Sequence, residues 1–120
     1  MPPPFTWSAE TPERLAEAPF FFCLRYPAEA GSARVLMVGE LDLAAASEAR
    51  CALRRAQNDA MTVICDLGDV SFIDLRGLHA ILDAAAHARC TGARLAISNP
   101  SPVCAGLLGV LGLEGHIEVA

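Results

Sequence analysis

The sequence predicts an α/β fold, in which a mixed, mostly parallel β-sheet carries several helices. Two observations predict this class. After two opening strands, helical and strand-like segments alternate along the chain in the order ββαβαβαβ. Strands joined through helices run parallel, because a right-handed crossover returns the chain in the same direction. The length of 120 residues suits one domain with a single core.

The first half of the domain opens with a β-hairpin. Residues 20–26 are rich in aromatic side chains, 34–38 are largely apolar, and the segment 27–32 between them contains turn-forming residues. An Ala-rich helix is expected at 44–57, and its buried face comprises Ala45, Ala49, Ala52, Leu53 and Ala56. Residues 61–67 are almost continuously apolar, which predicts a strand buried on both faces.

The second half continues the alternation. A helix is expected at 75–89, with an inward face made of Leu78, Ile81, Leu82 and Ala85. A strand follows at 93–98. Ser101 is then placed to cap a helix at 103–111, because Pro suits the first helical position that comes next. Residues 116–119 form a last short strand.

Residues 1–19 precede the domain, which we assign to residues 20–120. We expect this N-terminal extension to be flexible, with a short helix at 12–18. The first residues lack the basic and apolar regions of a signal peptide. The longest near-apolar run, 103–113, falls far short of the ~20 residues that span a bilayer. We therefore expect a cytoplasmic protein without a membrane partner.

Charge and cysteine usage narrow the class further. The formal net charge of −5 does not favour direct binding of nucleic acid. The five cysteines are odd in number and widely spaced, which is typical of reduced thiols in a cytosolic protein. Cys65 is expected in the core, whereas Cys51 and Cys90 are expected at exposed helix positions. Arg54 and Arg55 favour the thiolate form of Cys51, so Cys51 and Cys90 are possible redox sites.

Motifs for catalysis are absent from the sequence. It contains no Gly-x-Ser-x-Gly elbow, no phosphate-cradling Gly loop and no His-Glu-x-x-His pattern. Asp66, Asp69 and Asp74 follow a buried strand, as in some phospho-acceptor sites, but the chain has no lysine to accompany them. We therefore predict a protein that is not an enzyme, without catalytic residues or cofactors.

Three residues that recur at intervals of four along one helix, His79, Asp83 and His87, form the best candidate for a metal site. The two histidines are two turns apart, and two ligands at this spacing are few for a metal ion. We interpret these residues as the solvated face of the helix and predict no metal site.

The segment from Val70 to Leu78 carries the most information. It has the pattern of a buried strand that ends at Asp74 and turns at once into a helix. The Asp74 carboxylate is placed to accept hydrogen bonds from the free N–H groups of the first turn. Arg76 lies in that turn, where the helix dipole disfavours a cation by about 0.3–1 kcal/mol. A loose pair with Asp74, an acid on a partner or a bound anion would offset this cost.

Three pieces of the chain resemble the signature of the STAS domain family, to which bacterial anti-sigma factor antagonists belong. Residues 39–43, Gly-Glu-Leu-Asp-Leu, are similar to the family's turn after the second strand. Residues 65–78 are similar to its strand-to-switch segment. Residues 99–102, Asn-Pro-Ser-Pro, with Leu-Gly-Leu at 111–113, are similar to its third-helix unit.

The resemblance implies a STAS-type fold and a module that acts by binding. Its partner would be an anti-sigma factor, typically a serine kinase, whose capture frees a sigma factor to regulate transcription. By position, the contact surface would comprise Asp74, Leu75, Arg76 and Gly77, together with Gly39, Glu40 and Asp42. We expect a monomer or a weak dimer.

The position of the family's switch is altered in this chain. In switchable members, the residue after the Asp is a serine that the partner kinase phosphorylates, whereas this chain has Leu75 there. The chain therefore resembles an antagonist that phosphate does not switch at this position. The alternative is a STAS-type scaffold or ligand-binding subunit of a larger complex. In that case, oxidation of the cysteines would regulate the protein.

Overall fold

The computed structural model describes residues 20–27, 31–113, 115 and 117–120, so the short helix expected at 12–18 lies outside the described residues. The elements follow the expected order of strands and helices. They are β1 (Phe21–Pro27), β2 (Ser32–Leu41), α2 (Leu43–Asp59), β3 (Thr62–Ile73), α3 (Leu75–Cys90), β4 (Arg94–Ser98), α4 (Pro102–Leu111) and β5 (Glu118–Val119).

The strands form one five-stranded sheet in the order β1-β2-β3-β4-β5. β1 pairs antiparallel with β2, and every later pair is parallel, which confirms the mixed, mostly parallel sheet. β2 extends beyond both of its expected ends, whereas β3 ends at Ile73, directly before Asp74, as the sequence indicates. β2 continues past Gly39, whose φ of 110° accompanies a shift in the pairing register with β3. A glycine that the sequence places at a turn is thus an irregularity inside a longer strand.

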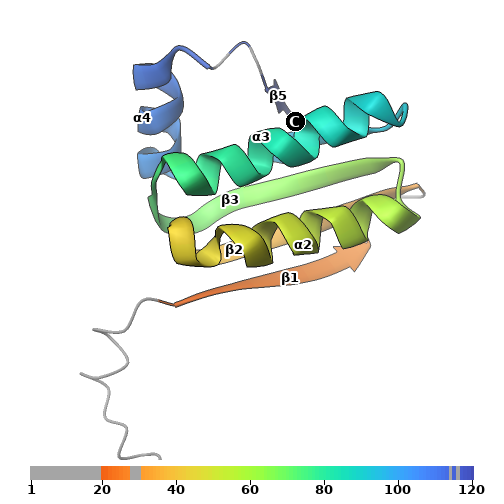
Figure 1. Cartoon of the computed structure of the whole chain (residues 1–120), viewed down its shortest axis with the longest axis horizontal. Helices are drawn as coiled ribbons and strands as arrows, with labels where there is room; N and C mark the ends of the chain where they lie inside the picture. Colours follow the sequence, from red (N-terminus) through yellow and green to blue (C-terminus); the bar gives the residue numbers. More distant parts are fainter. Residues whose placement is uncertain (1–19, 28–30, 114, 116) are drawn as a thin grey trace, which may run out of the picture.

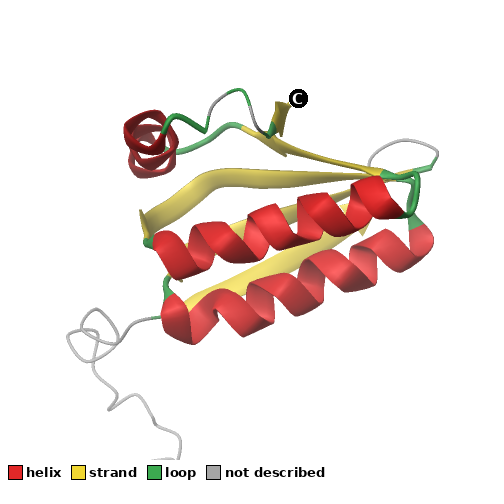
Figure 2. Ribbon diagram, turned by 45° about the horizontal axis from the view of Figure 1, so that its top comes forward, coloured by secondary structure: helices red, strands yellow, loops and turns green. Residues whose placement is uncertain are grey.

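Helices α2 and α3 lie side by side across one face of the sheet (Figures 1 and 2). The core between these two layers contains the largest fully buried side chains, among them Met37, Leu41, Leu53 and Ile81. Ala52 and Leu82, which were expected to face inward, lie only partly buried at the edge of this core. The strict alternation of buried and half-buried residues along β2 shows that only one face of the sheet is fully covered.

The expectation of a strand buried on both faces is wrong for residues 61–67. Val63, Cys65 and Leu67 are fully buried beneath the helices, but the intervening Ile64 and Asp66 are only half-buried. Their face of the sheet has no helix over it among the described elements (Figure 2). The apolar run has a different cause, because Ile64 lies beside Ala96 of β4 and contributes to a partly apolar open face.

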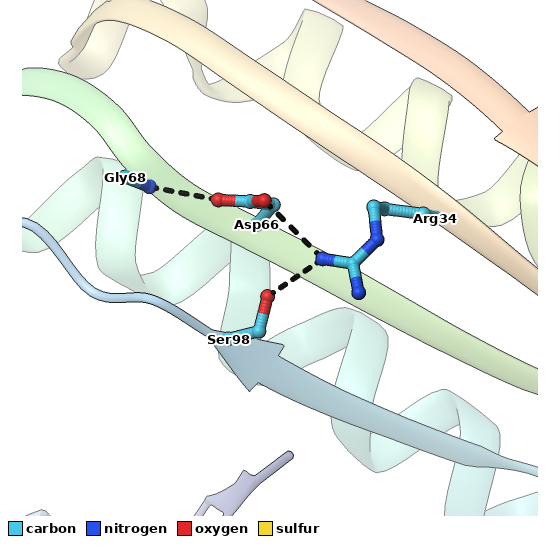
Figure 3. Close-up of polar contacts among 4 residues, drawn as sticks. All are labelled: Arg34, Asp66, Gly68 and Ser98. Carbon is cyan, nitrogen blue, oxygen red and sulfur yellow. Dashed lines mark hydrogen bonds and ion pairs between the residues drawn. The ribbon is translucent and has the colours of Figure 1, made fainter. Parts of the chain in front are cut away.

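A polar network crosses the centre of this open face (Figure 3). Nη1 of Arg34 donates to Oδ2 of Asp66 at 3.2 Å and to Oγ of Ser98 at 3.0 Å. The backbone N–H of Gly68 donates to the other oxygen of Asp66 at 3.0 Å. The network therefore ties β2, β3 and β4 together, which gives Asp66 a structural role.

Candidate partner-binding site

Asp74 connects the starts of two helices. Its Oδ1 accepts a hydrogen bond from the backbone N–H of Gly77 at 2.9 Å, which confirms it as the N-cap of α3. Its Oδ2 accepts from the backbone N–H of Leu43, the first residue of α2, at 3.2 Å. One carboxylate thus satisfies otherwise unpaired donors of both helices, and it fixes the two N-termini next to each other.

Asp42 performs the same task for α2 alone. Its Oδ1 accepts from the backbone N–H of Ala45 at 3.1 Å. Leu41 and Ile73 are paired residues of the parallel strands β2 and β3, so Asp42 and Asp74 directly follow neighbouring strand ends. The surface that the sequence predicts is therefore assembled at the carboxyl ends of the two central strands, where open α/β sheets present their sites.

Two glycines of the predicted surface act through their lack of a side chain. A Cβ at Gly77 would overlap the backbone carbonyl oxygen of Leu41, so glycine lets α3 begin close against the end of β2. A Cβ at Gly39 would overlap the carbonyl oxygen of Phe20, and its φ is 110°. Both glycines are buried, so they position this surface without offering side chains to a partner.

The exposed part of the surface is apolar with one cation. Leu75 is 60 % exposed at the first position of α3, and Arg76 beside it is also exposed. Within the described residues, Arg76 forms no ion pair, and the loose pair with Asp74 is not present. The two oxygens of Asp74 instead accept from the backbone N–H groups of Leu43 and Gly77.

Glu40 and Asp42 are half-buried and line a shallow pocket of about 170 Å³ with Phe20 and Glu48. Sequence reasoning missed Leu43, which is 61 % exposed at the start of α2 and bonded through its N–H to Asp74. The sequence does contain a signal for the exposure of Leu43: this apolar residue directly follows an Asp cap but falls outside the apolar stripe of its helix.

The cysteines divide as expected. Cys51 and Cys90 are exposed and Cys65 is buried. Burial raises the pKa of the Cys65 thiol, and it raises the pKa of the Cys23 thiol to about 12, with the Glu48 carboxylate contributing. Cys51 and Cys23 line the same groove of about 500 Å³ between α2 and the edge of the sheet.

Asp83 has a more specific role than the solvated face predicted for it. Its Oδ2 lies 3.6 Å from Nη2 of Arg50 on α2 and 3.6 Å from Nδ1 of His79. The ion pair with Arg50 links the outer surfaces of α2 and α3. In the part of the chain that the structure describes, no group of three or more His, Cys, Asp or Glu residues could hold a metal ion.

Comparison with known proteins assigns the family. The model of the STAS domain matches residues 30–120, most of the chain. The chain belongs to the STAS domain family. A comparison with curated proteins found no match. Across the described residues, no helix has the length and apolar character to cross a membrane.

Solved structures of STAS-type proteins share this fold. The structure of the anti-sigma factor antagonist SpoIIAA in its unphosphorylated form has 22 % identity and a TM-score of 0.68, over 82 % of this chain and 88 % of that one. An anti-sigma factor antagonist from Mycobacterium paratuberculosis has 17 % identity and a TM-score of 0.69, over 83 % and 85 %. A sulfate transporter family protein from Wolinella succinogenes has 21 % identity and a TM-score of 0.63, over 75 % of each chain.

Proposed function

We propose that this STAS domain is an anti-sigma factor antagonist. It binds an anti-sigma factor of the serine-kinase type in the cytoplasm and so releases a sigma factor, without catalysis and without contacting nucleic acid or membrane. The observation that carries the proposal is the exposed Leu75–Arg76 pair at the start of α3, held in place by Asp74 and Gly77. The two solved antagonists with the same fold support it.

The domain is proposed to bind without a phosphate switch at this position. Leu75 has no hydroxyl group to accept phosphate, and Arg76 has none either. The hydroxyl group of Ser71 is close in sequence, but Ser71 lies within β3 and its Oγ donates to the carbonyl oxygen of Gly39 at 3.3 Å. The binding surface would therefore stay free of phosphate in the presence of the kinase.

The experiment is a reconstitution with three purified components: this chain, an anti-sigma factor of serine-kinase type from the same genome, and the sigma factor it sequesters. Addition of the chain to the preformed pair should release the sigma factor, as followed by gel filtration, and preincubation with ATP should not reduce the release. If the chain releases no sigma factor from any of the kinase-type pairs of that genome, the proposal is wrong.

A second candidate is a STAS-type scaffold or ligand-binding subunit of a larger complex, regulated through Cys51. The likeness to a sulfate transporter family protein and the exposed Cys51 favour it. Under this candidate, the chain would copurify with a stable multi-subunit complex and leave anti-sigma pairs intact.

A further inference from the structure

An apolar groove continues from the proposed binding surface toward the C-terminal end of α4. It has a volume of about 440 Å³, in the range of sites that hold small organic ligands. Five leucines line it: Leu75, Leu78, Leu82, Leu111 and Leu113. The first three lie along one side of α3 and the other two at the end of α4 and just beyond, in the region where Figure 1 shows α4 beside the first turns of α3.

The groove opens at the surface with its apolar wall in view. Leu75 is 60 % exposed and Leu111 is 41 % exposed, while Leu78 forms a buried floor. These exposed leucines are available to contact an apolar partner surface.

The charged side chain that lines the groove is the guanidinium of Arg76. Among the residues that the structure describes, Arg76 and His79 are the polar residues that line the groove, and no acidic residue does. Arg76 has no ion-pair partner within the described residues, and it stands in the first turn of α3, where the helix dipole disfavours a cation. A carboxylate from outside would offset this cost. The chain as a whole carries a net charge of −5, so a cationic rim here is local.

We propose that this groove docks an amphipathic helix of the partner, with leucine-like side chains on one face and a carboxylate beside them. The inference rests on the proposed function and names the part of the anti-sigma factor that the same surface recognises. Continuity selects this occupant, because Leu75 and Arg76 belong both to the groove and to the predicted contact surface. Helices dock into apolar grooves through side chains spaced three and four residues apart, and Leu75, Leu78 and Leu82 present the matching spacing.

The first test uses a defined probe and the isolated chain. A synthetic helical peptide with leucines at positions i, i+3 and i+7 and a flanking Glu is titrated into the ¹⁵N-labelled protein. We expect shift changes centred on the groove, and at least tenfold weaker binding of a peptide with Lys in place of Glu. Absence of binding, equal affinity for both peptides, or shift changes elsewhere on the domain would overturn the proposal.

Matched variants locate the contact. Leu111→Ser should weaken peptide binding at least tenfold, whereas Val110→Ser, at an 84 % exposed neighbour that does not line the groove, should leave it unchanged. Arg76→Glu should reverse the preference between the two peptides. Equal effects of Leu111→Ser and Val110→Ser on peptide binding would contradict docking in the groove. Self-association of the parent chain in analytical ultracentrifugation, abolished by Leu111→Ser, would also contradict it, because a second copy of the chain would then occupy the groove.

The same variants separate this inference from the proposed function. If an anti-sigma factor binds the parent chain and Leu111→Ser equally well, the groove is not its docking site, although the function stands. If the Glu peptide binds as expected and no anti-sigma factor does, the groove recognises the predicted chemistry and the proposed function fails.

Discussion

The carboxylate of Asp74 accepts a hydrogen bond from the backbone N–H of Leu43, so the residue that caps α3 also holds the first residue of α2. These two residues are 31 positions apart in the chain. Their contact fixes the two exposed leucines, Leu43 and Leu75, on one surface at the carboxyl ends of β2 and β3. One carboxylate therefore contributes to the position of both exposed leucines of the proposed binding surface.

Replacing Asp74 should cost more stability than replacing Asp42. Asp74→Ala removes acceptors for two helix N-termini, at about 2 kcal/mol, whereas Asp42→Ala removes one, at about 1 kcal/mol. Urea denaturation of the two variants measures the difference. An equal loss in both would show that the bond to Leu43 contributes nothing to stability.

Gly77→Ala should destabilise the fold, because its Cβ would overlap the carbonyl oxygen of Leu41 and push α3 away from β2. Gly106→Ala is the matched control in α4, since a Cβ there meets no atom within 4 Å. The control should raise stability by up to about 1 kcal/mol through helix propensity. Thermal unfolding of both variants tests the pair, and tolerance of Ala at Gly77 would remove the argument from close packing.

Phosphate should not attach to the switch segment. Incubation with the cognate anti-sigma kinase and labelled ATP should leave residues 71–77 unlabelled, whereas Leu75→Ser should restore an acceptor at the helix start. Mass spectrometry of the peptide that contains this segment gives the result. Stoichiometric labelling of the parent chain between 71 and 77 would contradict the loss of the switch.

Thiol reactivity should follow exposure and thiol pKa. Cys51 should react first with a mild alkylating agent at neutral pH, and Cys65 only on unfolding. Cys23 should stay slow below its raised pKa of about 12 and speed up only toward alkaline pH, because the neutral thiol is a poor nucleophile. Peptide mapping after timed quenching measures the order. Regulation through Cys51 would require partner affinity to differ with and without reductant, and to lose that difference in Cys51→Ser.

Local signals in the sequence predicted much of this structure. An Asp or Ser before an apolar-periodic run marks a helix start, and Asp74 and Ser101 both cap as predicted. The bond from Asp74 to Leu43 and the ion pair between Arg50 and Asp83 had no such signal, because they join residues more than 30 positions apart. Only the packing of α2 against α3 brings them together.

The burial of β3 was mispredicted for a related reason. An apolar run such as 61–67 indicates a strand but does not say how many helices cover it, since Ile64 is apolar on a half-open face. The family resemblance names the residues of the contact surface, and their role in binding stays a prediction. The close packing at Gly39 and Gly77 could not be predicted from the sequence. It became visible only once the structure placed these glycines against the backbone of Phe20 and of Leu41 in β2.

We propose that the start of α3 is the contact surface for an anti-sigma factor. The most direct test of this proposal is the dissociation constant of the anti-sigma complex, by calorimetry, for Leu75→Glu and for Met61→Glu. The side chains of Leu75 and Met61 are both 60 % exposed. Met61, however, lies at the other end of the sheet, next to the first residue of β3. An acid suits a helix N-terminus, so Leu75→Glu should fold normally.

We predict that Leu75→Glu weakens binding at least tenfold, about 1.4 kcal/mol, because it places negative charge where phosphorylated relatives carry it. Met61→Glu should bind as the parent chain does. A folded Leu75→Glu variant that binds as tightly as the parent would place the interface elsewhere on the domain.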